Sequence, residues 1–232
     1  MAQLNINANN RLKLNVIRVL FLGDPGVGKT SLIYCLANDE YKSGLPAKIA
    51  DQTIPAKDAP ENVPLLLIDS SRRQVEKDLK DSIRCAHVIC LVYTLKDEEG
   101  FKRVLGHWIP LIREHQTNYS DMTYKPVILV ANKSDSYESK FKLEGVLAKL
   151  RKIVEIQSYF EASAKKRVNV REMLSSAQRA VMYPASPLID GKGKMRHEFI
   201  MALKQIFRAI MNSCVIFPLT SIRGAAGYIT AP

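Results

Sequence analysis

The sequence predicts an α/β protein whose mainly parallel sheet is covered by helices on both faces. Short apolar segments alternate with amphipathic segments, and this alternation requires crossover connections between parallel strands. The expected strands are 16–22, 64–68, 87–93, 127–131 and 159–162, and the expected helices are 32–37, 98–115, 143–153 and 170–183. In all we expect six strands, about five flanking helices and one C-terminal amphipathic helix.

Each element follows from its local pattern. The segment 16–22 is apolar and rich in β-branched residues, which is typical of a strand buried on both faces. Residues 39–60 hold prolines at intervals, so we expect a loop there. In 98–115 the apolar residues, Trp108 among them, recur at helical spacing and should face the core. The helix over 170–183 should end at the proline that follows it.

The chain divides into three regions. Residues 1–15 are polar and Asn-rich, and we expect a flexible arm. Residues 16–183 hold the α/β domain. Residues 184–232 begin with a linker containing Pro and Gly, and continue with an apolar stripe that predicts an amphipathic helix over 195–210. The tail after this helix has no clear period and stays unassigned.

Composition narrows the classes of protein. With 47% hydrophobic and 25% charged residues, the chain is typical of a soluble globular protein. The net charge of +11 is spread along the chain without the interleaved aromatics that stack on bases, so we expect no nucleic acid partner. Two interpretations of the positive charge remain open: a solvated surface and a surface that binds an acidic partner. The four cysteines stand at unrelated spacings, which favours free thiols. No apolar segment approaches the roughly 20 residues of a membrane span, so we expect no anchor in this chain.

A Gly-rich loop follows the first strand. Residues Gly23–Thr30 read Gly-Asp-Pro-Gly-Val-Gly-Lys-Thr and match Gly-x4-Gly-Lys-Ser/Thr between a strand and a helix. Glycines let successive N–H groups point at phosphate oxygens, and the helix N-terminus adds positive potential. Lys29 should reach the outer phosphates and the Thr30 hydroxyl should ligate Mg²⁺. On this P-loop NTPase fold, the expected phosphate contacts are Gly26, Val27, Gly28, Lys29, Thr30 and Ser31.

A second motif follows the strand 127–131 and points to guanine. In Asn132-Lys133-Ser134-Asp135, the Asp135 carboxylate can accept two hydrogen bonds from guanine N–H groups. Adenine lacks this donor pair, so ATP would leave the carboxylate unpaired. The tripeptide Ser163-Ala164-Lys165 follows the last strand and should supply a third loop to the base. The expected base contacts are Asn132, Lys133, Asp135, Ser163, Ala164 and Lys165.

Two further residues are candidates for the metal. Asp69 ends the strand 64–68, where an acid in P-loop proteins supports Mg²⁺. Thr53 lies in the loop 39–60, and its hydroxyl could close on Mg²⁺ and the γ-phosphate. The predicted magnesium site is therefore Thr30, Thr53 and Asp69. The alternative for Thr53 and Asp69 is that each residue only forms part of a turn.

These motifs, in this order, resemble those of Ras-like small GTPases over roughly residues 16–183. Within that superfamily the sequence resembles the N-terminal GTPase domain of mitochondrial Rho (Miro) GTPases. The features that carry the resemblance are Pro25 in the phosphate loop, the string Thr53-Ile-Pro, Asp69 at sixteen residues after Thr53, and the run Val181–Leu188 before an amphipathic helix. The chain lacks the EF-hand loop expected next in that family, which indicates a truncated or short form.

The resemblance implies a switch that binds and hydrolyses GTP with Mg²⁺ and acts in mitochondrial transport and morphology. Lys29 and Thr53 would serve catalysis, and the γ-phosphate would order residues 39–60 and 69–80. Activating factors, exchange factors and mitochondrial transport adaptors are the implied partners. The implied location is the cytosolic face of the mitochondrial outer membrane, whereas an anchorless form standing alone should be cytoplasmic.

One departure bears on hydrolysis. Ras-like proteins carry Asp-x-x-Gly-Gln after the third strand, but here Asp69 is followed by Ser70-Ser71-Arg72-Arg73. Both the glycine that meets the γ-phosphate and the glutamine that orients water are absent. Arg72 and Arg73 are candidates to orient the attacking water, and a solvated basic turn is the alternative.

Three functions stay open after this departure. The first is a GTP-hydrolysing switch, and the second is a GTP-loaded adaptor with negligible turnover. The third is an endomembrane Rab- or Rho-like GTPase, which the absence of a prenylation Cys disfavours. A P-loop kinase or ATPase is more distant, because Asp135 predicts that ATP does not compete with GTP.

Overall fold

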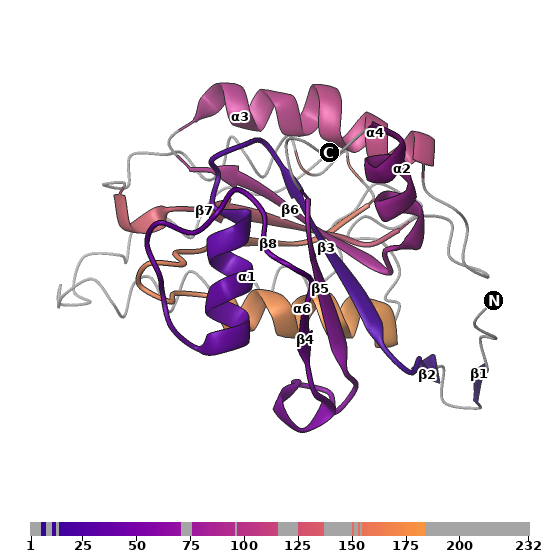
Figure 1. Cartoon of the computed structure of the whole chain (residues 1–232). Coiled ribbons are helices and arrows are strands. Elements are labelled where there is room, and N and C mark those ends of the chain that lie inside the picture. The colour runs from indigo at the N-terminus through magenta and orange to yellow at the C-terminus, as the bar shows by residue number, and fades with distance from the viewer. Residues whose placement is uncertain are drawn as a thin grey trace, which may run out of the picture.

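A six-stranded sheet forms the centre of the computed structural model, which describes residues 6–7, 11–12, 14–70, 76–95, 97–115, 125–136, 150, 153 and 155–183. The strand order is β4-β5-β3-β6-β7-β8 (Figure 1). All neighbours are parallel except β4 and β5. The bounds are β3 Ile17–Gly23, β4 Gln52–Ile54, β5 Leu65–Asp69, β6 Val88–Thr94, β7 Val127–Asn132 and β8 Ile156–Glu161. The predicted mainly parallel sheet is confirmed.

Strand β3 lies at the point where the strand order changes direction. Its next parallel strand, β5, lies on one side of it and β6 lies on the other. In open parallel sheets, ligands bind beside the carboxyl ends of the strands at such a point. The fold therefore directs attention to the loop after β3.

Helices cover both faces of the sheet, as expected (Figure 1). Helices α1 and α6 pack on one face, with Leu32 and Met173 in one buried cluster. Helices α2, α3 and α4 pack on the other face, with Ile83 and Ile112 in a second cluster. Alternate residues of β3 enter the two clusters, because successive side chains of a strand point to opposite faces. The bounds are α1 Lys29–Asn38, α2 Glu76–Cys85, α3 Glu98–Arg103, α4 Ile109–His115 and α6 Val170–Met182.

The predicted helix 98–115 is helical throughout but changes its winding in the middle. Between α3 and α4 lies the π-helical segment η2, Val104–Trp108, in which the Ile109 N–H donates to the Val104 carbonyl. Pro110 follows directly, and a proline has no N–H to continue the regular ladder. Trp108 is the last residue of this wider turn.

The structure differs from the expected elements in two places and adds detail in a third. The expected loop 39–60 contains β4, which is only three residues long, and the short 3₁₀ helix η1, Ala56–Asp58. Helix α2 has no counterpart among the predicted elements. The expected arm 1–15 contains an antiparallel pair, β1 Ile6–Asn7 with β2 Arg11–Leu12. Two- and three-residue strands are too short to show a period in the sequence.

Several predictions fall on residues that are not described. The helix expected over 143–153 lies outside the described residues apart from Leu150 and Ile153, and so do the linker, helix and tail predicted over 184–232.

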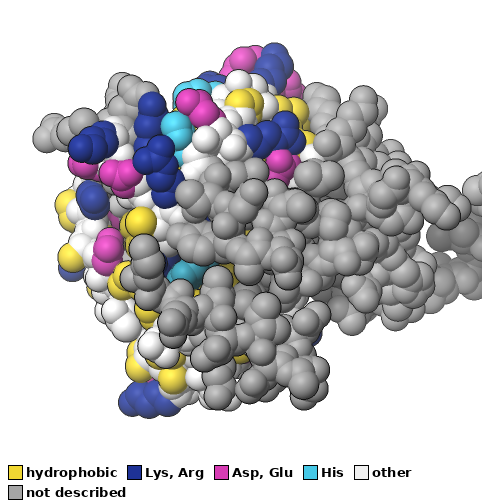
Figure 2. Space-filling model, turned by 90° about the vertical axis from the view of Figure 1, so that its right-hand side faces the viewer, with side chains coloured by type: hydrophobic (Ala, Val, Ile, Leu, Met, Phe, Trp, Pro, Cys, Tyr) yellow, Lys and Arg dark blue, Asp and Glu magenta, His cyan; other side chains and the backbone are white. Residues whose placement is uncertain are grey.

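Among the described residues, no helix has both the length and the apolar character that a bilayer span requires. On the face shown in Figure 2, the described Lys and Arg side chains are interspersed with Asp and Glu. This mixture is typical of a solvated surface.

Candidate nucleotide-binding site

The residues predicted to bind phosphate and base gather at the carboxyl ends of the parallel strands. The phosphate loop Gly23–Thr30 follows β3, Asp69 ends β5, and the loop beginning at Asn132 follows β7. Ser163 and Ala164 follow β8. Parallel strands bring these ends to one edge of the sheet, so residues up to about 140 positions apart in the sequence become neighbours.

The backbone of the phosphate loop requires glycine at defined positions. Gly26 and Gly28 have φ values of 77° and 95°, in the left-handed region that other residues avoid. A Cβ on Gly28 would also lie 2.4 Å from the Asn132 Nδ2 atom. The loop therefore keeps its shape and its close approach to the β7 loop only with glycine at this position. Helix α1 begins at the next residue and directs its N-terminus at the loop.

Lys29 is buried and its ammonium group is held by its own loop. The side chain is 8% exposed, and Nζ donates to the carbonyl oxygens of Gly23 and Asp24 at 2.9 Å each. Burial lowers the Lys29 pKa, while the charges of Asp69 and Asp24 act in the opposite direction. Neutral carbonyls are weak partners for an ammonium group, so phosphate oxygens in the loop would be stronger ones.

Thr30 and Asp69 form the second part of the site. The Asp69 Oδ2 atom accepts hydrogen bonds from the Thr30 hydroxyl at 2.7 Å and from the Ile49 N–H at 3.3 Å. Asp69 is 1% exposed, and its Oδ1 atom is buried without a hydrogen-bond partner in the part of the chain that the structure describes. Burial raises the Asp69 pKa, and the two hydrogen bonds oppose this shift.

An unpartnered carboxylate oxygen next to a hydroxyl fits a hard cation such as Mg²⁺, which prefers oxygen ligands and retains water. A water molecule on the metal would satisfy the orphan Oδ1 of Asp69. The residues present therefore fit the predicted metal at Thr30 and Asp69. The cation would also lower the Asp69 pKa, because it stabilises the charged carboxylate.

Thr53 does not join this cluster. It lies in β4 and is paired with Leu66, and its side chain is exposed. In the antiparallel register the residue level with Asp69 is near Ala50, and Ile49 is the residue that contacts the Asp69 carboxylate. Three residues of strand separate Thr53 from this level, a distance of roughly 10 Å. The expected loop around Thr53 is thus a strand in this structure, and the role of Thr53 as a metal ligand stays a prediction.

The Asn132 side chain ties the base loop to both neighbouring loops. It is 1% exposed, its Nδ2 donates to the Val27 carbonyl at 2.9 Å, and its Oδ1 accepts from the Ala164 N–H at 3.3 Å. Lys133, with φ of 65°, donates from Nζ to the Gly26 carbonyl at 2.7 Å. These bonds fix the β7 loop against the phosphate loop before any ligand is considered.

Asp135 is oriented by the loop after β8. Its Oδ1 accepts from the Ser163 hydroxyl at 2.5 Å, and the Ser163 oxygen in turn accepts from the Lys166 N–H at 3.0 Å. The carboxylate so oriented could accept hydrogen bonds from the N–H pair of guanine. Lys165 is exposed beside this cluster, and Ser31 lies in the first turn of α1. Arg72 and Arg73 lie outside the described residues.

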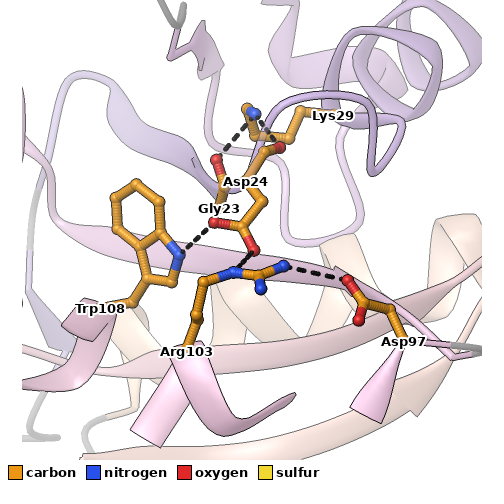
Figure 3. Close-up of polar contacts among 6 residues, drawn as sticks. All are labelled: Gly23, Asp24, Lys29, Asp97, Arg103 and Trp108. Carbon is orange, nitrogen blue, oxygen red and sulfur yellow. Dashed lines mark hydrogen bonds and ion pairs between the residues drawn. The ribbon is translucent and has the colours of Figure 1, made fainter. Parts of the chain in front are cut away.

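Sequence reasoning missed the contacts of one phosphate-loop residue. The two carboxylate oxygens of Asp24 accept from Arg103 Nε at 2.7 Å and from the Trp108 indole N–H at 3.1 Å (Figure 3). Trp108 was expected only in the core; it packs against the core cluster and also reaches this loop. The sequence feature that could have revealed these contacts is Asp24 itself, an acidic residue in a loop that binds anions.

The fold and these contacts define a class: an α/β domain with a phosphate loop after its central strand and an Asn-Lys-Ser-Asp loop after β7. The family model that matches this chain is the Ras family, over residues 18–183, which is more than half of the chain. The chain therefore belongs to the Ras family, whose members bind and hydrolyse GTP.

A relative supports the finer resemblance. The chain is 35% identical over 199 residues to Mitochondrial Rho GTPase 1 of Cryptococcus neoformans var. neoformans serotype D. The aligned part is 83% of this chain but 28% of that protein, so the chain spans less than a third of its relative's length. The resemblance to mitochondrial Rho GTPases is confirmed at the level of this one domain.

Proposed function

We propose that residues 16–183 form a GTP-hydrolysing switch in which Lys29, Thr30 and Asp69 bind the Mg²⁺-triphosphate and Asn132, Lys133 and Asp135 bind the base. The observation that carries the proposal is the set of side-chain bonds joining the two loops: Asn132 to Val27, and Lys133 to Gly26. They set phosphate-binding and base-binding groups at a fixed separation, which is what recognition of one whole nucleotide requires.

The chain's own groups would act chiefly through position and charge. The Lys29 ammonium, displaced from the carbonyls of Gly23 and Asp24, would offset the charge that builds on the outer phosphates. N–H groups of the phosphate loop would add to this stabilisation. Bound Mg²⁺ would supply further charge neutralisation between the phosphates. Thr30 and Asp69 would hold it.

A GTP-loaded adaptor without turnover is the second candidate. It is favoured by the residues that follow Asp69, because Arg72 and Arg73 stand where the glycine and the glutamine of Asp-x-x-Gly-Gln would serve hydrolysis. The Ser70 N–H is already bonded to the Phe21 carbonyl, so it donates within the sheet. Arg72 and Arg73 remain the proposed groups for orienting water in the first candidate.

The deciding experiment is single-turnover release of phosphate from GTP with Mg²⁺, with Lys29→Ala as the control. Release by the wild type clearly above the control supports the switch, and stable GTP binding without release supports the adaptor.

GTP binding is measured first, with ATP as competitor. Equal competition by ATP would refute the role given to Asp135. We expect Lys29→Ala to weaken GTP binding about 10- to 100-fold, because a charge-assisted contact contributes about 1.5–3 kcal/mol.

We also propose a place of action at the mitochondrial outer membrane, with activating or exchange factors and transport adaptors as partners. The support is the similarity to a relative named for mitochondria, over 83% of this chain. Fractionation of cells expressing the chain from its own gene tests the location. Recovery with endomembranes instead would favour the Rab- or Rho-like alternative.

A further inference from the structure

Helix α3 and segment η2 form hydrogen bonds with a carboxylate side chain of the phosphate loop. Asp24 is the second residue of the loop, and both of its carboxylate oxygens are bonded to this helical segment, one to Arg103 and one to Trp108 (Figure 3). The Asp24 side chain is 15% exposed, so its charge is largely removed from water. This contact joins two elements that no motif of the sequence connects.

The donors are themselves fixed in place. Arg103 Nη2 donates to Asp97 Oδ2 at 3.0 Å, and Asp97 is the N-terminal cap residue of α3. Gly100 leaves room for that carboxylate, because a Cβ there would lie 2.8 Å from Asp97 Oδ2. Trp108 packs its ring against the buried cluster, with its indole N–H directed at Asp24. The Arg103 guanidinium thus lies between the carboxylates of Asp24 and Asp97.

Asp24 also takes part in the phosphate loop through its backbone carbonyl, on the side where the nucleotide is expected. The Asp24 carbonyl accepts from Lys29 Nζ, while the Asp24 side chain is held from the opposite direction (Figure 3). A carboxylate turned toward the loop interior would repel phosphate oxygens and would compete with them for Lys29. Both effects grow with the charge of the nucleotide, so they would oppose a triphosphate more than a diphosphate.

We infer that Arg103 and Trp108 are positioning residues for the phosphate loop, which hold the Asp24 carboxylate away from the phosphates and so set the preference for GTP over GDP. The inference rests on the proposed function, since it concerns the same nucleotide site. It assigns to the α3–η2 segment a role in nucleotide binding although none of its residues is expected to contact the nucleotide.

The test is a mutant cycle on the purified chain with Mg²⁺-GTP and Mg²⁺-GDP. We expect Arg103→Gln to weaken GTP binding about tenfold and GDP binding less, since the Asp24 carboxylate would lose its charged partner. Asp24→Asn should bind GTP at least as well as the wild type, and the double variant should regain that affinity. Trp108→Phe keeps the ring and removes the N–H, and should show a smaller loss in the same direction.

The matched control is Lys102→Gln, which removes the same charge from the same helix but breaks only the exposed pair with Glu99. It should leave both affinities unchanged. Trp108 is the single tryptophan of the chain, so its emission in the nucleotide-free protein reports the contact independently of binding. Asp24→Asn and Arg103→Gln should alter this emission, and Lys102→Gln should not.

The outcomes separate the two proposals. A wild type that binds GTP together with an Arg103→Gln variant that binds both nucleotides equally well would overturn the inference alone. A loss in Arg103→Gln that Asp24→Asn does not restore would also overturn it, because Arg103 would then act by another route. A wild type that binds no guanine nucleotide would overturn the proposed function and the inference with it.

Discussion

The two ends of the parallel sheet hold their charged and titratable side chains in different ways. At the amino end, Arg113 forms two hydrogen bonds with the Glu155 carboxylate at 2.5 and 2.9 Å, and Lys125 donates to the last carbonyls of α2. At the carboxyl end, among the described residues, Lys29 has only backbone carbonyls as hydrogen-bond acceptors, and one oxygen of Asp69 has no partner.

This difference separates stability from function. Groups at the amino end bind segments of the chain to one another, so their interactions are complete without a ligand. Groups at the carboxyl end leave strong interactions unmade, which a nucleotide and a cation would complete. Substitutions at the carboxyl end should therefore change binding with little effect on stability, and substitutions at the amino end should do the reverse.

The largest effect is expected from Asp135→Asn at the carboxyl end. The amide oxygen can still accept from Ser163, so the fold should persist, but the charged acceptor for guanine is lost. We expect GTP affinity to fall about 100-fold, in line with the loss of a charge-assisted pair of hydrogen bonds, and the melting temperature to stay close to that of the wild type. Titration with a fluorescent GTP analogue measures the affinity.

The control for this variant is Asp58→Asn, an exposed carboxylate in the β4–β5 connection at the other end of β5. It removes the same charge and should leave GTP affinity unchanged. A large drop in stability of Asp135→Asn, with its affinity retained, would contradict the separation of the two ends.

A pH-dependent loss of stability is expected from His87 at the amino end. Its Nδ1 accepts from the Arg18 N–H, and burial, with the charges of Arg18 and Lys125, lowers its pKa to about 4. A histidine whose folded-state pKa is lowered stabilises the fold above its unfolded pKa of about 6.5, and this stability is lost as the pH falls toward 4. We expect the loss to reach about 2 kcal/mol.

The measurement is chemical denaturation of the wild type and His87→Asn between pH 7 and pH 4.5. An asparagine can accept from the Arg18 N–H but does not titrate, so the stability difference between the two proteins should shrink on acidification. A difference independent of pH would show that the fold does not lower the His87 pKa.

The smallest effect is expected from Arg113→Gln. Glu155 has 5% of its side chain exposed and would lose its ionic partner, but Arg113 is 47% exposed and water screens the pair. We expect a loss of about 1 kcal/mol in the free energy of unfolding, with GTP affinity unchanged. Arg84→Gln, which breaks a pair with both side chains about half exposed, is the matched control and should show no measurable loss.

Sequence reasoning placed the long elements and the loops that follow them, for a physical reason. Strands buried on both faces give continuous apolar runs, and the phosphate and base motifs come directly after two of them, β3 and β7. It could not place β4, because a three-residue edge strand is fixed by its pairing with β5. Thr53, expected in a loop, is for the same reason found in the strand, registered opposite Leu66.

The contacts of Asp24 were also beyond the sequence. They involve Trp108, the last residue of a π-helical segment that no periodicity specifies. By contrast, the pairing of Asp135 with the loop after β8 was anticipated in outline, because both follow neighbouring parallel strands.

The strand order also governs how the protein is made. Of the six strands of the central sheet, β3 emerges first from the ribosome, and its neighbours β5 and β6 follow, so the phosphate loop acquires its surroundings while the second half of the chain is still being synthesised. Asn132 and Ala164, which close the base side, arrive last, on the strands β7 and β8 at the growing edge of the sheet. A nascent chain therefore completes its phosphate cradle before it can distinguish guanine from adenine.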